Sequence, residues 1–147
     1  MLYFDDLEVG QRFVSPGRTV TEADVISFAG LSGDYHRLHT DDEYAKRSMF
    51  GSRIAHGMLT LTLSSGLLFR VGLLDTGAAF LGCSPRFTAP VRFGDTLTLH
   101  VEVSAKRETR HTDRGVVTYQ LATLNQRGET VLECDWTMML LKRGHDQ

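Results

Sequence analysis

Residues 56–71, HGMLTLTLSSGLLFRV, decide which fold this chain can adopt. Leu, Met, Phe and Val lie on nearly every face of a helix drawn through this segment, and small Ser, Thr and Gly residues fill most of the other positions. A helix that is apolar nearly all round must be buried on most of its faces. The wider stretch 54–74 also contains His56 and Arg70, which makes it too polar for a lipid-facing span. We therefore predict a buried or half-buried helix and no contact with a membrane.

The chain that follows this helix changes to a period of two. From Ala79 onward, and most clearly over 97–103, apolar residues alternate with polar ones, as in a strand with one buried face. The β-branched run 116–124 and the alternation over 132–140 predict two further long strands. Hairpin turns between such strands make them antiparallel. The turn signals lie at residues 93–95, 112–115 and 125–128.

Shorter elements are predicted ahead of the buried helix. The opening segment, 4–13, alternates in character like a short strand, and 18–20 predicts a second one. Residues 21–24, Thr-Glu-Ala-Asp, resemble a capping box that begins a helix, and Gly33 is suited to ending it. A second capping box at Thr40 predicts another short helix through about residue 47.

One apolar helix followed by a long antiparallel meander predicts an α+β fold. Such a helix buries all its faces only if the sheet curls around it. The length of 147 residues fits one domain, and the sequence contains no linker, low-complexity segment or internal repeat. We expect a single domain over 1–147.

Composition narrows the class of protein further. The hydrophobic fraction is 41%, the charged fraction 23% and the net charge −2, which is typical of a soluble globular protein. No basic block suggests a nucleic-acid partner. The first ten residues, MLYFDDLEVG, are acidic where a signal peptide is basic. Cys83 and Cys134 lie in apolar, strand-like segments, which favours two buried thiols over a disulfide. Free thiols in turn favour a cytoplasmic location.

Asp34 and His39 are the residues best suited to acid–base chemistry. They lie five residues apart in a polar segment between the two predicted capped helices. A carboxylate and an imidazole within reach of one water can move its proton near neutral pH. A surface Asp and a capping or solvent-facing His give the same spacing, so the two residues alone leave both interpretations open.

The sequence around this pair resembles the hydratase motif of the MaoC-like family, which runs Ser-Gly-Asp, any residue, Asn-Pro, an aliphatic residue and His, with an Ala six residues later. Residues 28–45, FAGLSGDYHRLHTDDEYA, follow this pattern and place Ala45 at its last position. Residues 53–59, RIAHGML, resemble the family's start of the central helix, and 87–95, FTAPVRFGD, resemble a third stretch. The likeness covers most of the chain and implies a hot-dog fold, a long antiparallel sheet wrapped around a central helix.

The resemblance implies roles for individual residues. The family's catalytic Asp and His match Asp34 and His39, and its oxyanion-hole amide matches the backbone N–H of Gly57. Glycine suits that position, because a helix N-terminus attracts negative charge and the missing Cβ lets a thioester approach. Taken alone, Gly57 is equally consistent with a turn glycine. Ser65 matches a serine near the pair in the family, but it is equally consistent with a hydroxyl that packs against a neighbouring element. The expected substrate-binding residues are Ser65, His56 and Arg37.

The activity implied by the resemblance is that of an (R)-specific enoyl-CoA hydratase. Such an enzyme hydrates trans-2-enoyl-CoA to 3-hydroxyacyl-CoA, or catalyses the reverse dehydration. Water adds in the syn sense, with one of Asp34 and His39 taking its proton as the oxygen attacks the β-carbon. The sequence does not assign which of the two is base and which is acid. Coenzyme A enters as part of the substrate, and no cofactor is implied.

The chain departs from the family motif where His36-Arg37 replaces Asn-Pro. Losing the proline frees the φ angle and adds a backbone N–H, but the His side chain can hydrogen-bond as Asn would, so we expect the loop to form. Arg37 is either solvated or close to a carboxylate or phosphate of an unusual acyl-CoA. His36, His39 and Asp34 also suggest metal ligands, with His56 as a distant fourth. No Cys or second carboxylate completes a tight set, so we expect no metal.

Two other functions share the hot-dog scaffold. An acyl-CoA thioesterase has the same fold, but the Ser-Gly-Asp…His string is not a thioesterase signature known to us, and function depends on the site. A non-catalytic acyl-binding partner subunit is expected to have lost Asp34 or His39, and both are present. The resemblance also implies a homodimer or a dimer of dimers, whose sheets join edge to edge. The loop 72–78 is expected to line the acyl channel.

Overall fold

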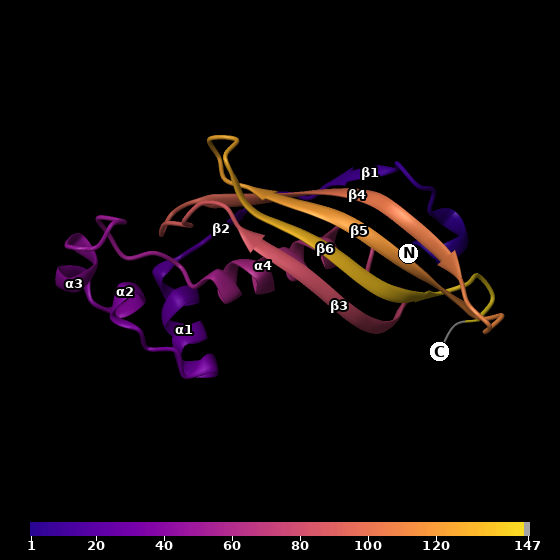
Figure 1. The fold of residues 1–147 in the computed structure, drawn as a ribbon, viewed down its shortest axis with the longest axis horizontal. Coiled ribbons are helices and arrows are strands. Elements are labelled where there is room, and N and C mark those ends of the chain that lie inside the picture. The colour runs from indigo at the N-terminus through magenta and orange to yellow at the C-terminus, as the bar shows by residue number, and fades with distance from the viewer. Residues whose placement is uncertain (146–147) are drawn as a thin grey trace.

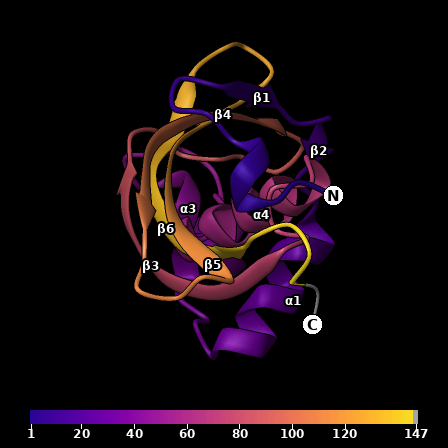
Figure 2. The ribbon, with the colours of Figure 1, turned by 90° about the vertical axis from the view of Figure 1, so that its right-hand side faces the viewer.

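The central helix, α4 (Gly57–Arg70), runs along one face of an antiparallel sheet in the computed structural model, which describes residues 1–145 (Figure 1). It is half-buried, because Met58 and Phe69 are 57% and 58% exposed. Seen from the end of the molecule, the sheet curls around this helix (Figure 2). The prediction of an α+β fold with the sheet wrapped around an apolar helix is confirmed. The other elements are η1 (Phe4–Asp6), β1 (Arg12–Val14), β2 (Arg18–Thr19), α1 (Glu22–Ser32), α2 (Arg37–Thr40), α3 (Asp42–Lys46), β3 (Gly77–Phe87), β4 (Thr96–Glu108), β5 (Arg114–Leu124) and β6 (Thr130–Leu141).

The sheet has six strands in the order β1-β4-β5-β6-β3, and the short β2 also pairs with β4. Tyr119 of β5 lies opposite Val103 of β4 and Trp136 of β6, so one register runs across the three central strands. Buried and more exposed positions alternate along these strands, which gives the sheet one apolar face. β3, 11 residues long, pairs with β6 and forms an edge of the sheet.

The core lies between this apolar face and α4. Leu67 and Leu68 of the helix are almost fully buried and pack in one cluster with the inward side chains of the sheet. A polar contact crosses the core, because the hydroxyl oxygens of Ser64 and Thr123, both fully buried, lie 2.7 Å apart. None of the described helices, α4 included, is long and apolar enough to cross a membrane.

The helices α1, α2 and α3 gather at one end of the molecule, beside the first turn of α4 (Figure 1). The predicted capping box at Thr21 begins α1, and Gly33 ends it with a φ of 79°, a conformation that favours glycine. Arg53 binds Glu22 of α1 and Asp42 of α3, each at 2.6 Å. These ion pairs tie the helical end to the segment that leads into α4.

Two short elements differ from their predictions. The segment around Phe4 is a turn of 3-10 helix and not a strand, and this places Phe4 and Leu7 on one side, where both are buried. β1 therefore begins later in the segment. The cap of α3 is Asp41, whose carboxylate accepts from a first-turn amide at 2.9 Å, because Thr40 already belongs to the last turn of α2.

The two cysteines are free thiols, as predicted, but only one of them lies in the core. Cys134 of β6 is buried, whereas Cys83 on the edge strand β3 is half-buried. Burial raises the pKa of the Cys134 thiol to about 11. The prediction of two core thiols is thus wrong for Cys83, because the edge strand has a neighbour on one side only.

Candidate active site

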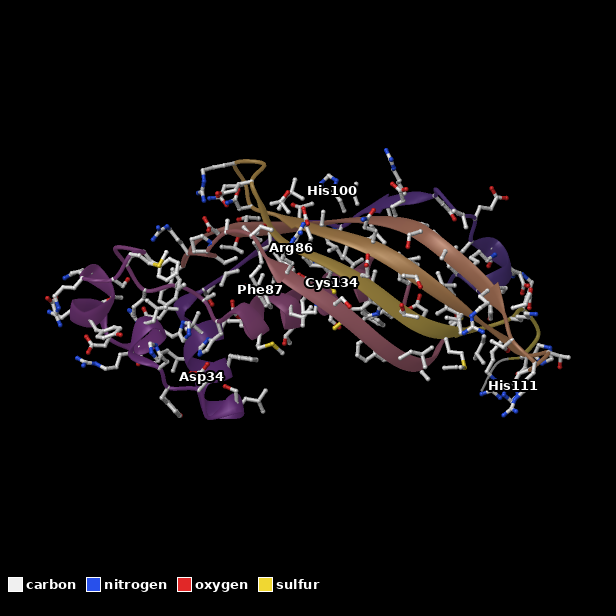
Figure 3. All side chains as sticks on the ribbon, in the orientation of Figure 1. Asp34, Arg86, Phe87, His100, His111 and Cys134 are labelled. Atoms are coloured by element: carbon white, nitrogen blue, oxygen red, sulfur yellow. The ribbon has the colours of Figure 1, made fainter. Side chains whose placement is uncertain are left out.

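Asp34 is placed by the way α1 ends. The left-handed Gly33 turns the chain, and the backbone N–H of Asp34 then donates to the Ser32 hydroxyl at 3.1 Å. A carboxylate oxygen of Asp34 accepts from the N–H of His36, also at 3.1 Å. The side chain is exposed and lies at the helical end of the molecule (Figure 3). The carboxylate is therefore held by its own loop and accessible to a ligand.

His39 lies on the single turn α2. His36 caps this turn, because its Nδ1 accepts from the N–H of Leu38 at 3.1 Å. The loop thus forms as expected, and the His36 side chain takes part in it as a hydrogen-bond acceptor. His39 is largely buried, and its own Nδ1 lies 2.8 Å from the carbonyl oxygen of Ile54. A carbonyl only accepts, so Nδ1 carries the hydrogen and Nε2 keeps a free lone pair.

Burial lowers the pKa of His39 below its ordinary value of 6.5. Positive charge on nearby His56 or His36 also lowers this pKa. The hydrogen bond to the Ile54 carbonyl and the negative charge of Asp34 raise it. Burial is the largest of these causes. At pH 7 the ring is therefore neutral, and its Nε2 can accept a proton.

The structure brings the predicted acid–base pair together. A carboxylate oxygen of Asp34 and ring nitrogens of His39 and His56 all lie within 4.8 Å of one another. Two groups at such a separation can share one water molecule, which hydrogen-bonds each of them at about 2.8 Å. The arrangement is thus suited to holding a water between an exposed carboxylate and an unprotonated imidazole nitrogen.

Gly57 begins α4 directly beside this pair. Among the described side chains, none caps the start of α4, whereas those of Thr21 and Asp41 cap α1 and α3. The first amides of α4 therefore remain available to a ligand, at the positive end of the helix dipole. A Cβ on Gly57 would lie 3.3 Å from the ring of Phe87 on β3, so glycine leaves room for that ring.

Two of the predicted substrate-binding residues, His56 and Arg37, differ in their exposure to solvent. His56 is only 2% exposed, so it offers almost no surface to a substrate, and its role in substrate binding stays a prediction. Arg37 binds the Asp41 carboxylate at 2.7 Å and lies over the ring of Tyr44. Its guanidinium is thus largely exposed and paired with Asp41. This agrees better with a solvated Arg37 than with one that meets a charged group of the substrate.

Ser65 lies two turns beyond Gly57, about 12 Å along the helix axis. It lines a cavity of about 460 Å³ between α4, the start of β3 and β6. The predicted channel loop contributes to this cavity, although β3 already begins at Gly77. Its walls are mostly apolar and include Ser65, Leu74, Ala78, Phe80, Trp136 and Met138.

A larger hollow, of about 600 Å³, lies on the opposite face of the sheet. Polar side chains that point away from the core line it, His100 and Arg86 among them (Figure 3). The described residues that form this hollow include neither Asp34 nor His39. This hollow is therefore separate from the predicted acid–base pair.

Asp34, His39 and His56 also form a group whose ligand atoms lie close enough together to hold a metal ion. The rings of His39 and His56 are stacked with their centroids 3.8 Å apart and their planes 28° from parallel. A metal ion lies in the plane of each imidazole that binds it, and nearly parallel stacked rings direct their lone pairs along nearly parallel lines. This stacking weighs against one ion bound by both rings, and the absence of a metal stays a prediction.

Comparison with known proteins identifies the family of this chain. Residues 6–125 match the family described as MaoC like domain. The chain belongs to this family. An (R)-specific enoyl-CoA hydratase of Rhodospirillum rubrum is 37% identical over 142 residues, which are 97% of this chain and 94% of that protein. The crystal structure of a MaoC-like dehydratase from the same organism has a TM-score of 0.89 at 36% identity, covering 97% of this chain and 99% of the other.

A solved structure with a named fold also matches this chain. A conserved hypothetical protein of Mycobacterium tuberculosis, described as having a double hotdog fold, matches with a TM-score of 0.88 at 24% identity. The match covers 99% of this chain and 46% of that one, so this chain corresponds to about one of its two halves. The predicted hot-dog fold is therefore confirmed.

Sequence reasoning missed two features of the site. Phe87 was recognised as part of a motif, but its contact with Gly57 joins residues 30 positions apart and has no local signal. His56 was predicted to bind substrate, whereas the structure buries it through the packing of α1 and α2. The alternation of β3 is irregular, with register shifts near Ala79 and Leu81, and so gave no clear inward face.

Proposed function

We propose that this protein is an (R)-specific enoyl-CoA hydratase, a MaoC-like hydratase or dehydratase that acts on acyl thioesters. The observation that supports this most directly is the free Nε2 of His39 within one water's reach of the Asp34 carboxylate, beside the open first turn of α4. The similarity to the (R)-specific enoyl-CoA hydratase of Rhodospirillum rubrum, which extends over nearly the full chain, supports the choice of reaction.

In the proposed reaction one water molecule is held between Asp34 and His39. Nε2 of His39 takes a proton from this water as its oxygen bonds to the β-carbon of the trans-2-enoyl thioester. The electron pair of the double bond moves toward the thioester oxygen, which accepts a hydrogen bond from the amide of Gly57. The proton held by the pair then passes to the α-carbon on the same face. One water is added and the pair returns to its starting state.

The acyl tail extends from the catalytic pair toward Ser65 in this proposal. Phe87 packs against Gly57 at one end of β3, and Phe80 lines the cavity near the other end, so the strand runs beside the helix over this distance. The mostly apolar cavity suits a hydrocarbon chain. Coenzyme A is part of the substrate, and the two free thiols are compatible with the reducing cytoplasm in which we place the protein.

We further propose that the protein is a homodimer joined through β3. This long edge strand exposes Phe80, Leu81 and Phe87, which are 55%, 49% and 45% exposed. A long apolar edge is a template for pairing with another strand, and pairing with its own copy would cover it. Leu81→Glu is expected to produce monomers in sedimentation equilibrium, whereas Val14→Glu, on the short edge strand β1, should not. Monomeric wild-type protein would contradict the dimer.

The proposed activity is tested by following loss of the enoyl thioester absorbance with crotonyl-CoA. Asp34→Asn and His39→Gln should each lower kcat by about 10²–10⁴-fold while remaining folded. His111→Gln, a matched change on an exposed histidine at the far end of the sheet, should leave the rate unchanged (Figure 3). Release of free thiol without hydration would replace the proposal with a thioesterase. No reaction with short, long or dicarboxylic enoyl-CoAs would favour a non-catalytic acyl-binding subunit.

A further inference from the structure

The ring of His56 packs against α1 and α2, two elements that surround the acid–base pair. One face stacks on His39 of α2, with ring centroids 3.8 Å apart. Phe28 of α1 meets the ring edge-on, with its centroid 5.0 Å away. The residue is 2% exposed, so its orientation is fixed by packing and not by solvent.

The polar atoms of this ring have a defined arrangement. Nε2 lies 2.9 Å from the backbone carbonyl oxygen of Asp34, 22 residues away in the sequence. Because that carbonyl only accepts, Nε2 carries the hydrogen and donates it. Nδ1 is buried and has no hydrogen-bond partner in the described part of the chain. The one donated hydrogen bond thus joins the Asp34 loop to the residue that precedes α4.

Resting on the function proposed above, we propose that His56 is a positioning residue that fixes Asp34, His39 and the first amide of α4 relative to one another. Its Nε2–H holds the main chain of Asp34, its ring face supports the ring of His39, and its own backbone continues into Gly57. The three groups come from three separate segments of the chain. His56 contacts or adjoins all three, which no pairwise contact within the Asp34 loop can do.

The same contacts give His56 an influence on the base. The titratable groups that face His39 are His36 across one edge, Asp34 toward the solvent and His56 beneath the ring. The ring of His56 supplies part of the burial that keeps His39 neutral. Removing the ring is therefore expected to move the titration of His39 as well as the geometry of Asp34.

Two substitutions separate these contributions. His56→Phe keeps a flat ring against His39 and Phe28 but loses the donor to Asp34. His56→Gln loses the ring but keeps a donor, because its amide nitrogen reaches about as far from the backbone as Nε2 does. Misplacement of a reacting group by about 1 Å costs on the order of 10²-fold in rate. We expect His56→Phe to lower kcat for crotonyl-CoA by 10- to 100-fold with KM changed less than threefold, and His56→Gln to retain kcat within about threefold.

The pH dependence provides a second readout that a merely structural role would not move. In His56→Gln the acid limb of the rate profile should shift upward toward pH 6.5, because His39 is less shielded from water. His111→Gln should leave both the rate and the profile at wild-type values. Wild-type kcat in His56→Phe would overturn the proposal, and so would an equal loss of kcat in both variants while each remains folded by circular dichroism.

A measurement on the wild-type protein keeps the proposal testable if either variant fails to fold. Nitrogen-15 NMR distinguishes a ring nitrogen that carries hydrogen from one that does not. We expect His56 to carry hydrogen on Nε2 and His39 to carry it on Nδ1. The opposite tautomer at His56 would remove the bond to Asp34 and overturn the proposal. This measurement does not require turnover, so absence of hydratase activity would contradict the proposed function and leave the placement of His56 to be decided separately.

Discussion

Adding a single methyl group at Gly57 should separate activity from stability. The φ angle of Gly57 is not positive, so alanine can adopt the backbone without strain. The new Cβ would lie 3.3 Å from two ring atoms of Phe87, which is tight but not prohibitive. Phe87 is 45% exposed, so its ring can shift by the few tenths of an ångström required.

The two effects of Gly57→Ala differ in size. Replacing Gly by Ala in a helix interior gains up to about 1 kcal/mol, less in a first turn, and displacing Phe87 offsets part of this gain. The net change in unfolding free energy should therefore stay within about 1 kcal/mol, or roughly 2–4 °C in Tm for a chain of this size. The methyl group also occupies the space beside the amide that receives the thioester oxygen. Misplacing that oxygen by about 1 Å should lower kcat/KM on the order of 10²-fold, equivalent to about 2.7 kcal/mol.

The assay combines steady-state hydration of crotonyl-CoA with thermal unfolding of the same preparations. Gly66→Ala is the matched control, because it lies on the same helix and its Cβ would meet no atom within 4 Å. That variant should be equally or more stable and fully active. Wild-type kcat/KM in Gly57→Ala would refute the role of the amide, and a loss of activity that tracks unfolding would refute the separation of the two effects.

Four further outcomes follow from the structure. Because burial lowers the pKa of His39, the acid limb of kcat/KM should lie below pH 6.5, and a limb above that value would contradict a neutral, buried base. The same shift means that the contribution of His39 to stability is complete above pH 6.5 and is lost as the pH falls toward the folded-state pKa, which urea titrations can follow. Gly115→Ala should lower the unfolding free energy by about 1–3 kcal/mol, measured by urea denaturation, because its Cβ would overlap the ring of Phe4. The hydrogen bond from Arg18 lowers the pKa of Asp24 from 3.8 to about 2, so stability should fall as the pH drops from about 4 to 2, and Asp24→Asn should flatten that decline.

The architecture was predictable where a local pattern has one structural solution. The alternation over 97–103 places its apolar residues in the core, and Thr21 and Gly33 begin and end α1 as capping rules require. Phe4 shows the opposite case. Its spacing from Leu7 fits a short turn of helix as well as an irregular strand, and only the contact with Gly115 distinguishes them.

The candidate site was predictable in its residue types but not in its internal arrangement. The Ser-Gly-Asp…His string pointed to Asp34 and His39, which the structure brings together. The choice of base depended on the Ile54 carbonyl, 15 residues from His39, which fixes the tautomer. The place of His56 depended in turn on the packing of three helices, and such contacts between distant segments leave no periodic signal in a sequence.

The hydrogen bond between Ser64 and Thr123 has a consequence for the angular setting of α4. Apolar contacts around a helix resist its rotation about its own axis only weakly, because one apolar side chain can take the place of another. The buried hydroxyls of Ser64 and Thr123, in contrast, hydrogen-bond at only one rotation of the helix. Ser64 lies seven residues after Gly57, close to two full turns, so both residues occupy nearly the same side of the helix. This contact between α4 and the central strand β5 thus fixes the rotation of the helix about its axis, and with it the orientation of a glycine two turns away.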